Sequence, residues 1–226
     1  MMHVLDRPVW NALATVHAGF AQGSELAKRY DPTIVPFAAP ADLTQASLDA
    51  LAALPAPSEV MVIVESQPVE TPPSLETVMD AVLVQMVAEK PFEPIEDPRI
   101  EPLGEADAEE MLELANLTKP GPFTLRAQAL GTFWGIRESG RLVAMAGQRM
   151  RQPGYAELSG LCTRPEFQGK GLGKTMMRFV AGEISARGDA VFLHAYRSND
   201  GAIAMYEKMG FSLRREMHMR VAKRPN

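Results

Sequence analysis

The sequence predicts an α/β fold in which a mixed, mostly antiparallel sheet is flanked by helices. Strand-like and helix-like patterns alternate along the second half of the chain, and three of the strand-like segments follow one another with only short turns between them. A glycine-rich loop also stands directly between a strand-like segment and an amphipathic helix. A smaller α/β region is predicted to precede this half.

The first half contains apolar patterns of both kinds but no chemical motif. Helical spacing of apolar residues predicts helices over residues 9–30, 43–54 and 74–88. Strands are predicted for residues 33–38 and for residues 60–64, the latter a short apolar run bounded by polar residues. We therefore predict that this half serves as support, as a pocket wall or as a partner surface.

The second half is predicted to alternate strands and helices more regularly. The turn sequences Glu138-Ser-Gly140 and Gln152-Pro-Gly154 separate three strand-like segments, which predicts an antiparallel meander. The predicted strands are residues 99–103, 132–138, 142–150, 155–163, 190–196 and 211–221. The predicted helices are residues 106–117, 125–130, 172–186 and 200–209.

An acidic, proline-rich stretch at residues 91–98 predicts a linker, and hence domains at residues 1–97 and 98–226. Residues 1–97 carry 4 Lys/Arg against 14 Asp/Glu, whereas residues 98–226 carry 19 against 14. A basic second half fits a polyanionic cofactor. Its basic residues are scattered and form no stripe with interleaved aromatic residues, which argues against a nucleic-acid partner.

The composition of the 226 residues is that of a globular protein, with 46% hydrophobic and 23% charged residues. We expect no membrane partner, because no apolar run is long enough to span a bilayer, and the first ten residues lack the pattern of a secretory signal. The single Cys162 excludes a disulfide framework, and the dispersed His3, His17 and His218 predict no metal site. These observations predict a cytoplasmic location.

The strongest local signal is the segment Thr163-Arg-Pro-Glu-Phe-Gln-Gly-Lys-Gly-Leu-Gly-Lys-Thr175, which joins a predicted strand to a predicted helix. Three glycines within five positions let the backbone bend and bring its N–H groups close to a ligand. The helix start adds unpaired donors and a partial positive charge, and Lys170 and Lys174 add full charges. The segment therefore predicts a site for a phosphate or pyrophosphate group rather than a plain strand-to-helix turn.

Two known phosphate loops fit this segment poorly. It ends in Gly-Lys-Thr as a Walker loop does, but Gln168 stands where the first glycine of that loop is needed. The next predicted strand also lacks the acidic residue expected to help hold Mg²⁺. The dinucleotide fingerprint fails because Lys174 occupies its third glycine position. A P-loop nucleotide-binding protein is kept as a less favoured alternative.

Residues 168–173 have the form Q-x-x-G-x-G, and residues 199–211 have the form N-x-x-A-x-x-x-Y-x-x-x-G-F. In this order and spacing, the two motifs resemble those of the GNAT superfamily of acetyltransferases. The resemblance covers residues 99–221, and residues 157–165 further look like the subgroup related to glycine N-acyltransferases. The strand–helix–strand rhythm of residues 1–97 suggests the hypothesis of a degenerate GNAT-like half.

The resemblance implies that acetyl-CoA lies in a cleft between two splayed parallel strands, those predicted to end at Thr163 and Tyr196. The backbone of Leu161, Cys162 and Thr163 would pair with the pantetheine arm, and Asn199 would support the cofactor or the neighbouring strand. Backbone amides would hold the pyrophosphate, and these belong to Gln168, Gly169, Lys170, Gly171, Leu172, Gly173 and Lys174.

The reaction implied by the resemblance is direct attack of an amine on the thioester. Neutralising a lysine-type amine at pH 7 costs roughly 4 to 5 kcal/mol, whereas an α-amine costs only about 1 kcal/mol, so a carboxylate that takes the proton is useful. Glu157 is the candidate general base because it lies in an otherwise apolar run on the cleft strand, with a surface position as the alternative. Tyr206 is the candidate general acid for the departing CoA thiolate, with core packing as the alternative. A backbone N–H near Leu161 or Cys162 would stabilise the oxyanion.

Other residues receive simpler interpretations. Cys162 lacks motif partners for nucleophilic catalysis and is interpreted as a small buried hydrophobe, while His194 is interpreted as a structural histidine, with a cleft role as the alternative. The predicted acceptor is a small amine, an amino acid or a protein N-terminus, and a homodimer is compatible with the family. The rival class of protein is a non-catalytic acyl-CoA-binding or regulatory module.

Overall fold

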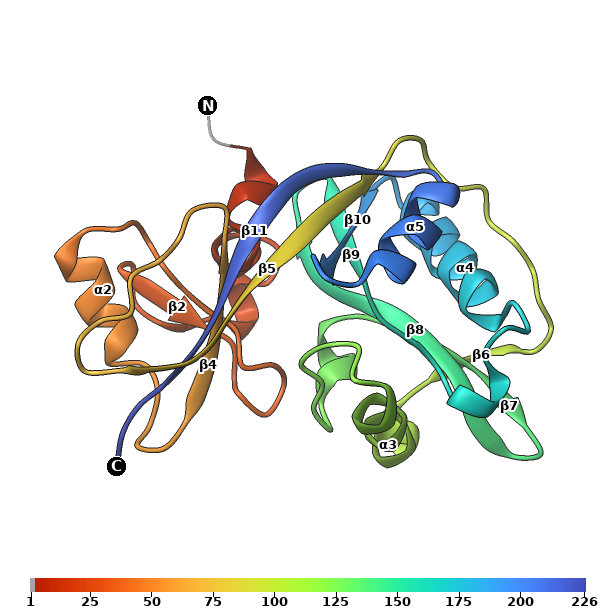
Figure 1. Cartoon of the computed structure of the whole chain (residues 1–226), viewed down its shortest axis with the longest axis horizontal. Helices are drawn as coiled ribbons and strands as arrows, with labels where there is room; N and C mark the ends of the chain where they lie inside the picture. The colour runs from red at the N-terminus through yellow and green to blue at the C-terminus, as the bar shows by residue number, and fades with distance from the viewer. Residues whose placement is uncertain (1–2) are drawn as a thin grey trace. The chain divides into compact units, whose positions relative to one another are not determined.

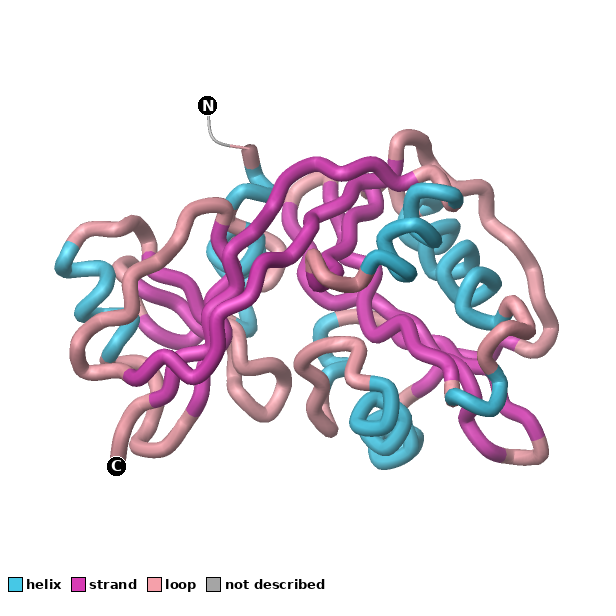
Figure 2. The backbone as a smooth tube through the Cα atoms, viewed as in Figure 1, coloured by secondary structure: helices cyan, strands magenta, loops and turns pink. Residues whose placement is uncertain are grey.

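The computed structural model describes residues 3–226, and its chain divides into two compact units (Figures 1 and 2). Unit 1 contains the described residues up to Pro32, together with Pro36–Met86 and His194–Asn226. Unit 2 contains Thr33–Val35 and Val87–Leu193. The division differs from the predicted boundary between residues 97 and 98, because the last 33 residues of the chain pack with its beginning. The predicted domain assignment stays a prediction.

The sheet of unit 2 has the predicted meander at its centre. The strand order is β10-β9-β8-β7-β6, with β9 and β10 parallel and the other neighbours antiparallel. Ser139 and Gly140 both have positive φ, as a two-residue hairpin turn requires, and Pro153-Gly154 makes the second turn. The strands are β6 (Ile100–Leu103), β7 (Phe133–Glu138), β8 (Arg141–Gln152), β9 (Tyr155–Thr163) and β10 (Ala190–Tyr196).

Two helices cover this sheet, α3 (Ala108–Thr118) and α4 (Leu172–Ala186), and Figure 2 shows the strands between them. The apolar face of α4 is buried over its whole length, as its amphipathic pattern predicts. Helix α3 packs Met111 and Leu114 into a core cluster with residues of β7, β8 and β9. Three short 3₁₀ segments complete the unit, namely η3 (Glu105–Asp107), η4 (Ala127–Leu130) and η5 (Pro165–Phe167).

Unit 1 contains three neighbouring strands, two from the first half of the chain and one from its C-terminal part. Strand β11 (Phe211–Lys223) lies between β4 (Val60–Glu65) and β5 (Glu76–Ala88), and it pairs antiparallel with β4 from His218↔Glu65 to Lys223↔Val60. Helix α5 (Asp200–Lys208) leads into β11. The remaining elements are η1 (Val4–Asp6), α1 (Pro8–Ala14), η2 (Ala18–Phe20), β1 (Gln22–Gly23), β2 (Ala27–Arg29), β3 (Ala38–Pro40) and α2 (Gln45–Ala52).

Three predictions for the first half are wrong. The helix predicted over residues 9–30 ends at Ala14, and residues 22–29 contribute two short strands instead. The strand predicted for residues 33–38 is displaced to Ala38–Pro40. The helix predicted over residues 74–88 is strand β5, because this segment pairs in a sheet and so gains hydrogen bonds and burial that its local pattern does not reveal.

The other predicted elements are confirmed, with ends that move by a few residues. Helix α4 and strands β9 and β10 have the predicted bounds. Among residues 3–226, no helix combines the length and the apolar content that a membrane span requires.

Candidate active site

Strand β9 carries a bulge near its end. The register between β8 and β9 shifts between Met145 and Gly147, where two residues of β9, Gly160 and Leu161, stand opposite one residue of β8. Gly160 has a φ of +63°, and a Cβ on it would lie 2.6 Å from Cε1 of Phe133, so both the backbone and the packing require glycine. A bulge leaves an extra residue outside the strand ladder. The bulge therefore removes part of the Gly160–Leu161 backbone from regular pairing with β8.

The loop after β9 reaches α4 through two glycines in the left-handed region. Gly169 has a φ of +76° and Gly171 a φ of +83°, and nothing lies within 4 Å of a Cβ placed on either residue. Glycine is therefore needed here for its backbone conformation, and the space beside it stays open. Gly171 is the N-cap of α4, and no side chain caps this helix. The first amides of α4 thus have neither an intrahelical acceptor nor a capping side chain.

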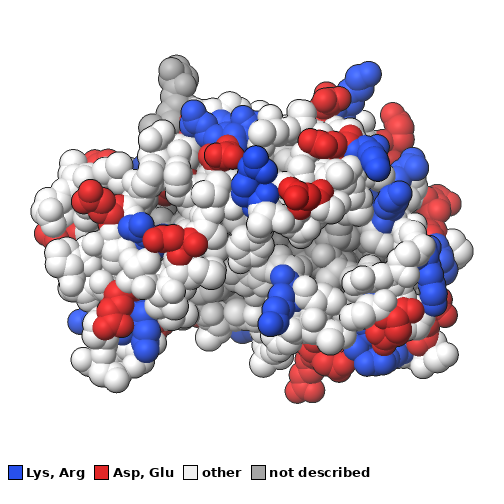
Figure 3. Space-filling view, in the orientation of Figure 1, with Lys and Arg blue, Asp and Glu red and all other residues white. Residues whose placement is uncertain are grey.

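The side chains of this loop add positive charge next to those amides. Lys170 and Lys174 are exposed, and the ammonium of Lys170 lies 4.4 Å from the ring centroid of Phe167. The side-chain amide of Gln168 donates to the carbonyl oxygen of Thr163 at 3.2 Å, which ties the middle of the loop to the end of β9. On the face drawn in Figure 3, basic and acidic side chains are interspersed. The loop combines backbone donors and cations, as the sequence predicts for an anion site.

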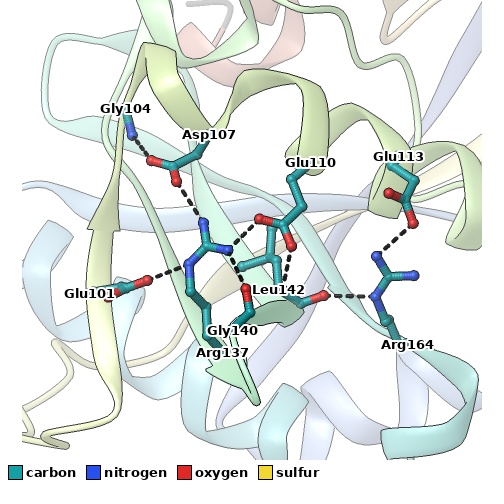
Figure 4. A network of polar contacts seen from close by, with 9 residues as sticks. All are labelled: Glu101, Gly104, Asp107, Glu110, Glu113, Arg137, Gly140, Leu142 and Arg164. Carbon is teal, nitrogen blue, oxygen red and sulfur yellow. Dashed lines mark hydrogen bonds and ion pairs between the residues drawn. The ribbon is translucent and has the colours of Figure 1, made fainter.

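Arg164 fixes the beginning of this loop (Figure 4). Its side chain is almost completely buried, with Nε donating to the carbonyl oxygen of Leu142 at 2.7 Å and Nη2 donating to Oε1 of Glu113 at 2.7 Å. Its backbone N–H donates to the carbonyl oxygen of Val143 at 2.8 Å. Hydrogen bonding from Arg164 lowers the pKa of Glu113. Arg164 therefore connects the loop with both β8 and α3.

A second arginine joins the beginning of α3 to the sheet (Figure 4). Arg137 on β7 donates to Glu101 and to Asp107, each at 2.6 Å, and also to Glu110. Glu110 in turn accepts the backbone N–H of Leu142 at 2.6 Å, and hydrogen bonding to Glu110 raises the pKa of Arg137. These contacts hold α3 in a fixed position against β8.

Glu157, the candidate general base, is fully buried on β9 and bound by an arginine. Arg149 on β8 donates from Nε to Oε2 of Glu157 at 2.8 Å and from Nη2 to Oε1 at 2.7 Å. Oε2 also lies 3.3 Å from the backbone N–H of Met150. The predicted alternative of a surface glutamate is wrong. The contact with Arg149 favours the ionised carboxylate, whereas the burial of Glu157 favours the protonated form.

Cys162 packs as the small hydrophobe that its sequence context predicts. It belongs to the core cluster with Met111, Leu114 and Met145, and its Sγ lies 3.4 Å from the carbonyl oxygen of Gly160. Burial raises the pKa of the Cys162 thiol to about 12. The reactive thiolate is therefore scarce at neutral pH, and nucleophilic catalysis by this side chain is disfavoured.

Asn199 and Tyr206 lie in unit 1, at the beginning and on the second turn of α5. Oδ1 of Asn199 accepts the backbone N–H of Ala202 at 3.1 Å, so this side chain caps the helix. Tyr206 is half-buried, with its ring centroid 6.2 Å from that of Phe211. Burial raises the pKa of Tyr206, which keeps the phenol protonated at neutral pH.

The structure thus groups the predicted site residues into two sets. Unit 2 holds Glu157 on β9, the bulged end of that strand and the loop from Gln168 to Lys174. Unit 1 holds Asn199 and Tyr206. Within residues 3–226, the side chains of His, Cys, Asp and Glu form no group of three that could hold a metal ion.

Comparison with known proteins gives the same family for both sets. The family model of FR47-like proteins matches residues 133–221. A crystal structure of a protein described as a GNAT-family acetyltransferase, from Novosphingobium aromaticivorans, is 40% identical over the whole of both chains and has a TM-score of 0.93. The chain belongs to the GNAT family of acetyltransferases. A GCN5-related N-acetyltransferase from Kribbella flavida covers 96% of the chain and 92% of its own length, with a TM-score of 0.58 and 16% identity, and shares the GNAT fold.

Curated relatives match shorter segments of this GNAT protein. N-alpha-acetyltransferase RimI of Mycobacterium tuberculosis is 36% identical over 80 residues, which are 34% of this chain and 49% of the relative. [Ribosomal protein bS18]-alanine N-acetyltransferase of Escherichia coli is 36% identical over 58 residues, which are 25% of this chain and 39% of the relative. The matched segments thus span half or less of the length of these relatives.

The sequence did not reveal the arginines that support the candidate site. Arg164 pairs with Glu113, 51 positions earlier, and Arg149 pairs with Glu157 across two strands. The only available signal was an arginine next to Pro165 at a predicted strand end and another in the predicted strand before Glu157. Such signals are common, and only the folded sheet shows which carboxylate each arginine meets.

Proposed function

We propose that this protein transfers an acetyl group from acetyl-CoA to the nitrogen of an amine. The observation that carries the proposal is the start of α4, where two left-handed glycines and an uncapped helix end present backbone donors next to open space. A pyrophosphate is the part of acetyl-CoA that such a site would bind. Membership of the GNAT family supports this cofactor and this chemistry.

In the proposed complex, the amides from Gln168 to Lys174 bind the pyrophosphate and the backbone of Leu161, Cys162 and Thr163 pairs with the pantetheine arm. The bulge at Gly160 supports this arrangement, because it frees backbone near Leu161 from the β8 ladder. A freed N–H would donate to the thioester oxygen as negative charge develops there. Asn199 contributes indirectly, by capping α5 and so fixing the helix that carries Tyr206.

The proposed reaction is direct transfer without an acyl-enzyme. The amine nitrogen forms a bond to the thioester carbon, and the tetrahedral intermediate then breaks its bond to sulfur. The thiolate leaving group takes a proton from the phenol of Tyr206, which the raised pKa of this residue keeps protonated at neutral pH. The buried, weakly ionised thiol of Cys162 supports the absence of a covalent step.

The amine must also lose a proton, and Glu157 is the proposed acceptor, with water as the carrier. Arg149 holds its carboxylate in place, and the proton that it must accept is easier to remove from an α-amine than from a lysine side chain. An α-amine needs only about 1 kcal/mol to lose its proton at pH 7, against roughly 4 to 5 kcal/mol for a lysine side chain. We therefore propose an α-amine acceptor, such as a protein N-terminus. The names of the two RimI-type relatives favour the same class.

The test is the rate of CoA release with acetyl-CoA and a panel of four acceptors. The panel contains a peptide with a free N-terminal amine, the same peptide blocked at its N-terminus but carrying a lysine, free glycine, and a simple alkylamine. We expect the free N-terminus to react fastest. Glycine as the best acceptor would instead favour the glycine N-acyltransferase-like subgroup that residues 157–165 resemble.

One alternative function has an observation in its favour. Because Glu157 is bound by Arg149, a protein that binds acyl-CoA without transferring it would have the same structure here. Saturable acetyl-CoA binding with no CoA release for any acceptor would favour this non-catalytic module, and Mg-ATP binding would favour a P-loop protein. A cytoplasmic location and a homodimer remain parts of the proposal, to be tested by fractionation and by light scattering.

A further inference from the structure

A small cavity in unit 1 adjoins a buried carboxylate that the proposed reaction does not use. The cavity has a volume of about 170 Å³, and all of its lining residues belong to unit 1. Its walls include the apolar side chains of Leu43 and Val69, together with the charged side chains of Arg7, Asp42 and Glu65. An engineered cavity of about 150 Å³ is large enough to admit benzene. The cavity of unit 1 therefore has room for a compact organic molecule.

Glu65, the last residue of β4, is the buried acid of this cavity. Only 5% of the residue is exposed. Its Oε2 accepts a hydrogen bond from Nε of Arg7 at 2.9 Å, and its Oε1 accepts a longer one from Nη2 of Arg7 at 3.3 Å. Within residues 3–226, these are the hydrogen bonds that the carboxylate makes. A carboxylate offers about four acceptor positions, so Glu65 can accept further hydrogen bonds.

Arg7 divides its donors between this carboxylate and two neutral acceptors. Its Nη1 donates to the carbonyl oxygen of Ala41, and its Nη2 also donates to that of Pro40. Burial raises the pKa of Glu65 to about 7, although the hydrogen bonds and the charge of Arg7 act in the opposite direction. One arginine therefore does not offset the cost of keeping this ionised carboxylate away from water. A second cation beside Glu65 would lower that cost.

The charges of the lining indicate the class of ligand. Arg7 contributes a positive charge, whereas Glu65 and Asp42 each contribute a negative charge when ionised. Hydrogen bonds from Thr44 lower the pKa of Asp42, so this residue is ionised at neutral pH. An anion in the cavity would meet two carboxylates, while a monocation would balance the charge of the lining. The electrostatics therefore favour a ligand with a single positive charge.

The apolar wall distinguishes an organic cation from a metal ion. Leu43 and Val69 supply hydrocarbon surface, from which an alkyl group gains stability and a hydrated metal ion does not. The part of the chain that the structure describes also has no group of three acidic, His or Cys side chains suited to a metal. We propose that this cavity binds a compact primary alkylammonium ion, which donates hydrogen bonds to Glu65 and packs its alkyl group against Leu43 and Val69. This binding does not depend on the proposed acetyl transfer.

Titration of the unaltered protein with isobutylammonium, isobutanol and isobutyrate tests the proposal, because these probes are similar in size and differ in charge. The backbone ¹H–¹⁵N signals of Ser66 and Gln67, which line the cavity, report binding at this place, and acetyl-CoA is left out. We expect saturable shifts with isobutylammonium and an affinity weaker by about tenfold or more for the other two probes. Equal affinity for isobutanol, or no saturable shift of these two signals with isobutylammonium, would overturn the proposal.

A matched pair of variants tests the part played by Glu65. Glu65→Gln removes the charge, keeps the shape of the side chain and should raise the Kd for isobutylammonium by about tenfold or more. Glu59→Gln is the control, because Glu59 also pairs with an arginine, Arg29 at 2.8 Å, but does not line the cavity. Thermal unfolding checks that both variants are folded. Equal loss of binding in both would contradict a site at this cavity.

The pH dependence of binding gives a check that needs no change at Glu65. A cationic ligand favours the ionised carboxylate, so isobutylammonium should bind about tenfold more tightly at pH 8 than at pH 6, while its own charge is kept at both values. The charges of Arg7 and Asp42 are the same at the two pH values. His218 on β11 pairs with Glu65 across the ladder, so His218→Gln serves as a control and should keep this dependence. Equal affinity at pH 6 and pH 8 would contradict binding to Glu65.

Discussion

Two helices of this protein begin directly after a strand or a turn, and their N-terminal ends are completed in different ways. At the start of α5, the side chain of Asn199 accepts the N–H of Ala202 and caps the helix. At the start of α4, Gly171 has a left-handed backbone and no side chain caps the helix. Both helices carry motif residues of the GNAT family, yet only α4 leaves its first amides to a ligand.

The difference in capping suits the two helices to different roles. An uncapped helix end costs stability unless something binds it, so α4 is suited to an anion such as a pyrophosphate. A capped helix is stable without a ligand, and α5 can hold Tyr206 in place whether or not the cofactor is bound. We therefore propose that the start of α4 binds the cofactor and that α5 carries the general acid.

The largest effect is expected from Tyr206→Phe, which removes the proposed general acid from α5. Loss of general acid catalysis should lower kcat by about 10²- to 10⁴-fold, while the KM for acetyl-CoA changes little. Because burial raises the pKa of Tyr206, activity of the unaltered enzyme should not fall through loss of this proton until pH exceeds about 10. A kcat within threefold of the unaltered value would remove Tyr206 from the mechanism.

Replacement of Gly171 should weaken cofactor binding at the start of α4. A β-branched residue disfavours a φ of +83°, so Gly171→Val should displace the loop and raise the Kd for acetyl-CoA by about tenfold or more. Gly188→Val is the matched control, because Gly188 has a φ of +82° and equally open space just after the other end of α4. Isothermal titration should show normal binding in the control. Equal loss in both variants would mean that general destabilisation, and not the site, is responsible.

Removal of the cap on α5 should affect stability more than cofactor binding. Asn199→Ala should lower the free energy of unfolding by about 1 kcal/mol, because the N–H of Ala202 loses its acceptor. Asn199→Asp keeps a capping oxygen and should retain the stability. Denaturant unfolding without ligand measures both variants. A large rise in the Kd for acetyl-CoA at unchanged stability would instead place Asn199 in contact with the cofactor.

The smallest effect concerns the charge of the loop. Lys174 is exposed in the first turn of α4, so Lys174→Ala should weaken acetyl-CoA binding by about two- to fivefold and reduce its dependence on salt. Arg178→Ala removes an equal charge from an exposed position one turn further along the helix and should have a smaller effect. Identical salt dependence in the two variants would show that net charge, rather than position, matters.

Much of unit 2 was predictable from the sequence because its elements are strongly periodic and separated by turn residues. The amphipathic pattern of α4 and the turns at Gly140 and Gly154 gave element bounds close to those observed. Over residues 74–88, by contrast, apolar residues recur at Leu75, Val78, Val82 and Met86, a spacing that also suits a helix. Pairing within the sheet makes this segment a strand, and a local sequence pattern does not reveal such pairing.

The candidate site likewise has features that the local sequence reveals and features that depend on contacts between distant residues. The glycine loop and the α5 motif could be found because their function requires certain residues at fixed local spacing. The contacts of Arg164 with Glu113 and of Gln85 with His194 join residues 51 and 109 positions apart, so no local sequence pattern predicts them. The bulge at Gly160 was also missed, since a glycine within a predicted strand has several interpretations.

The central claim is that the start of α4 binds the pyrophosphate of acetyl-CoA. Thermal unfolding with and without acetyl-CoA, with ATP and NADH as controls, tests it most directly. At one hundred times its Kd, acetyl-CoA should stabilise the fold by about 2.7 kcal/mol, a readily measured rise in Tm, while the controls should give little change. No shift at millimolar acetyl-CoA would contradict the claim, and with it the roles assigned to the loop and to Tyr206.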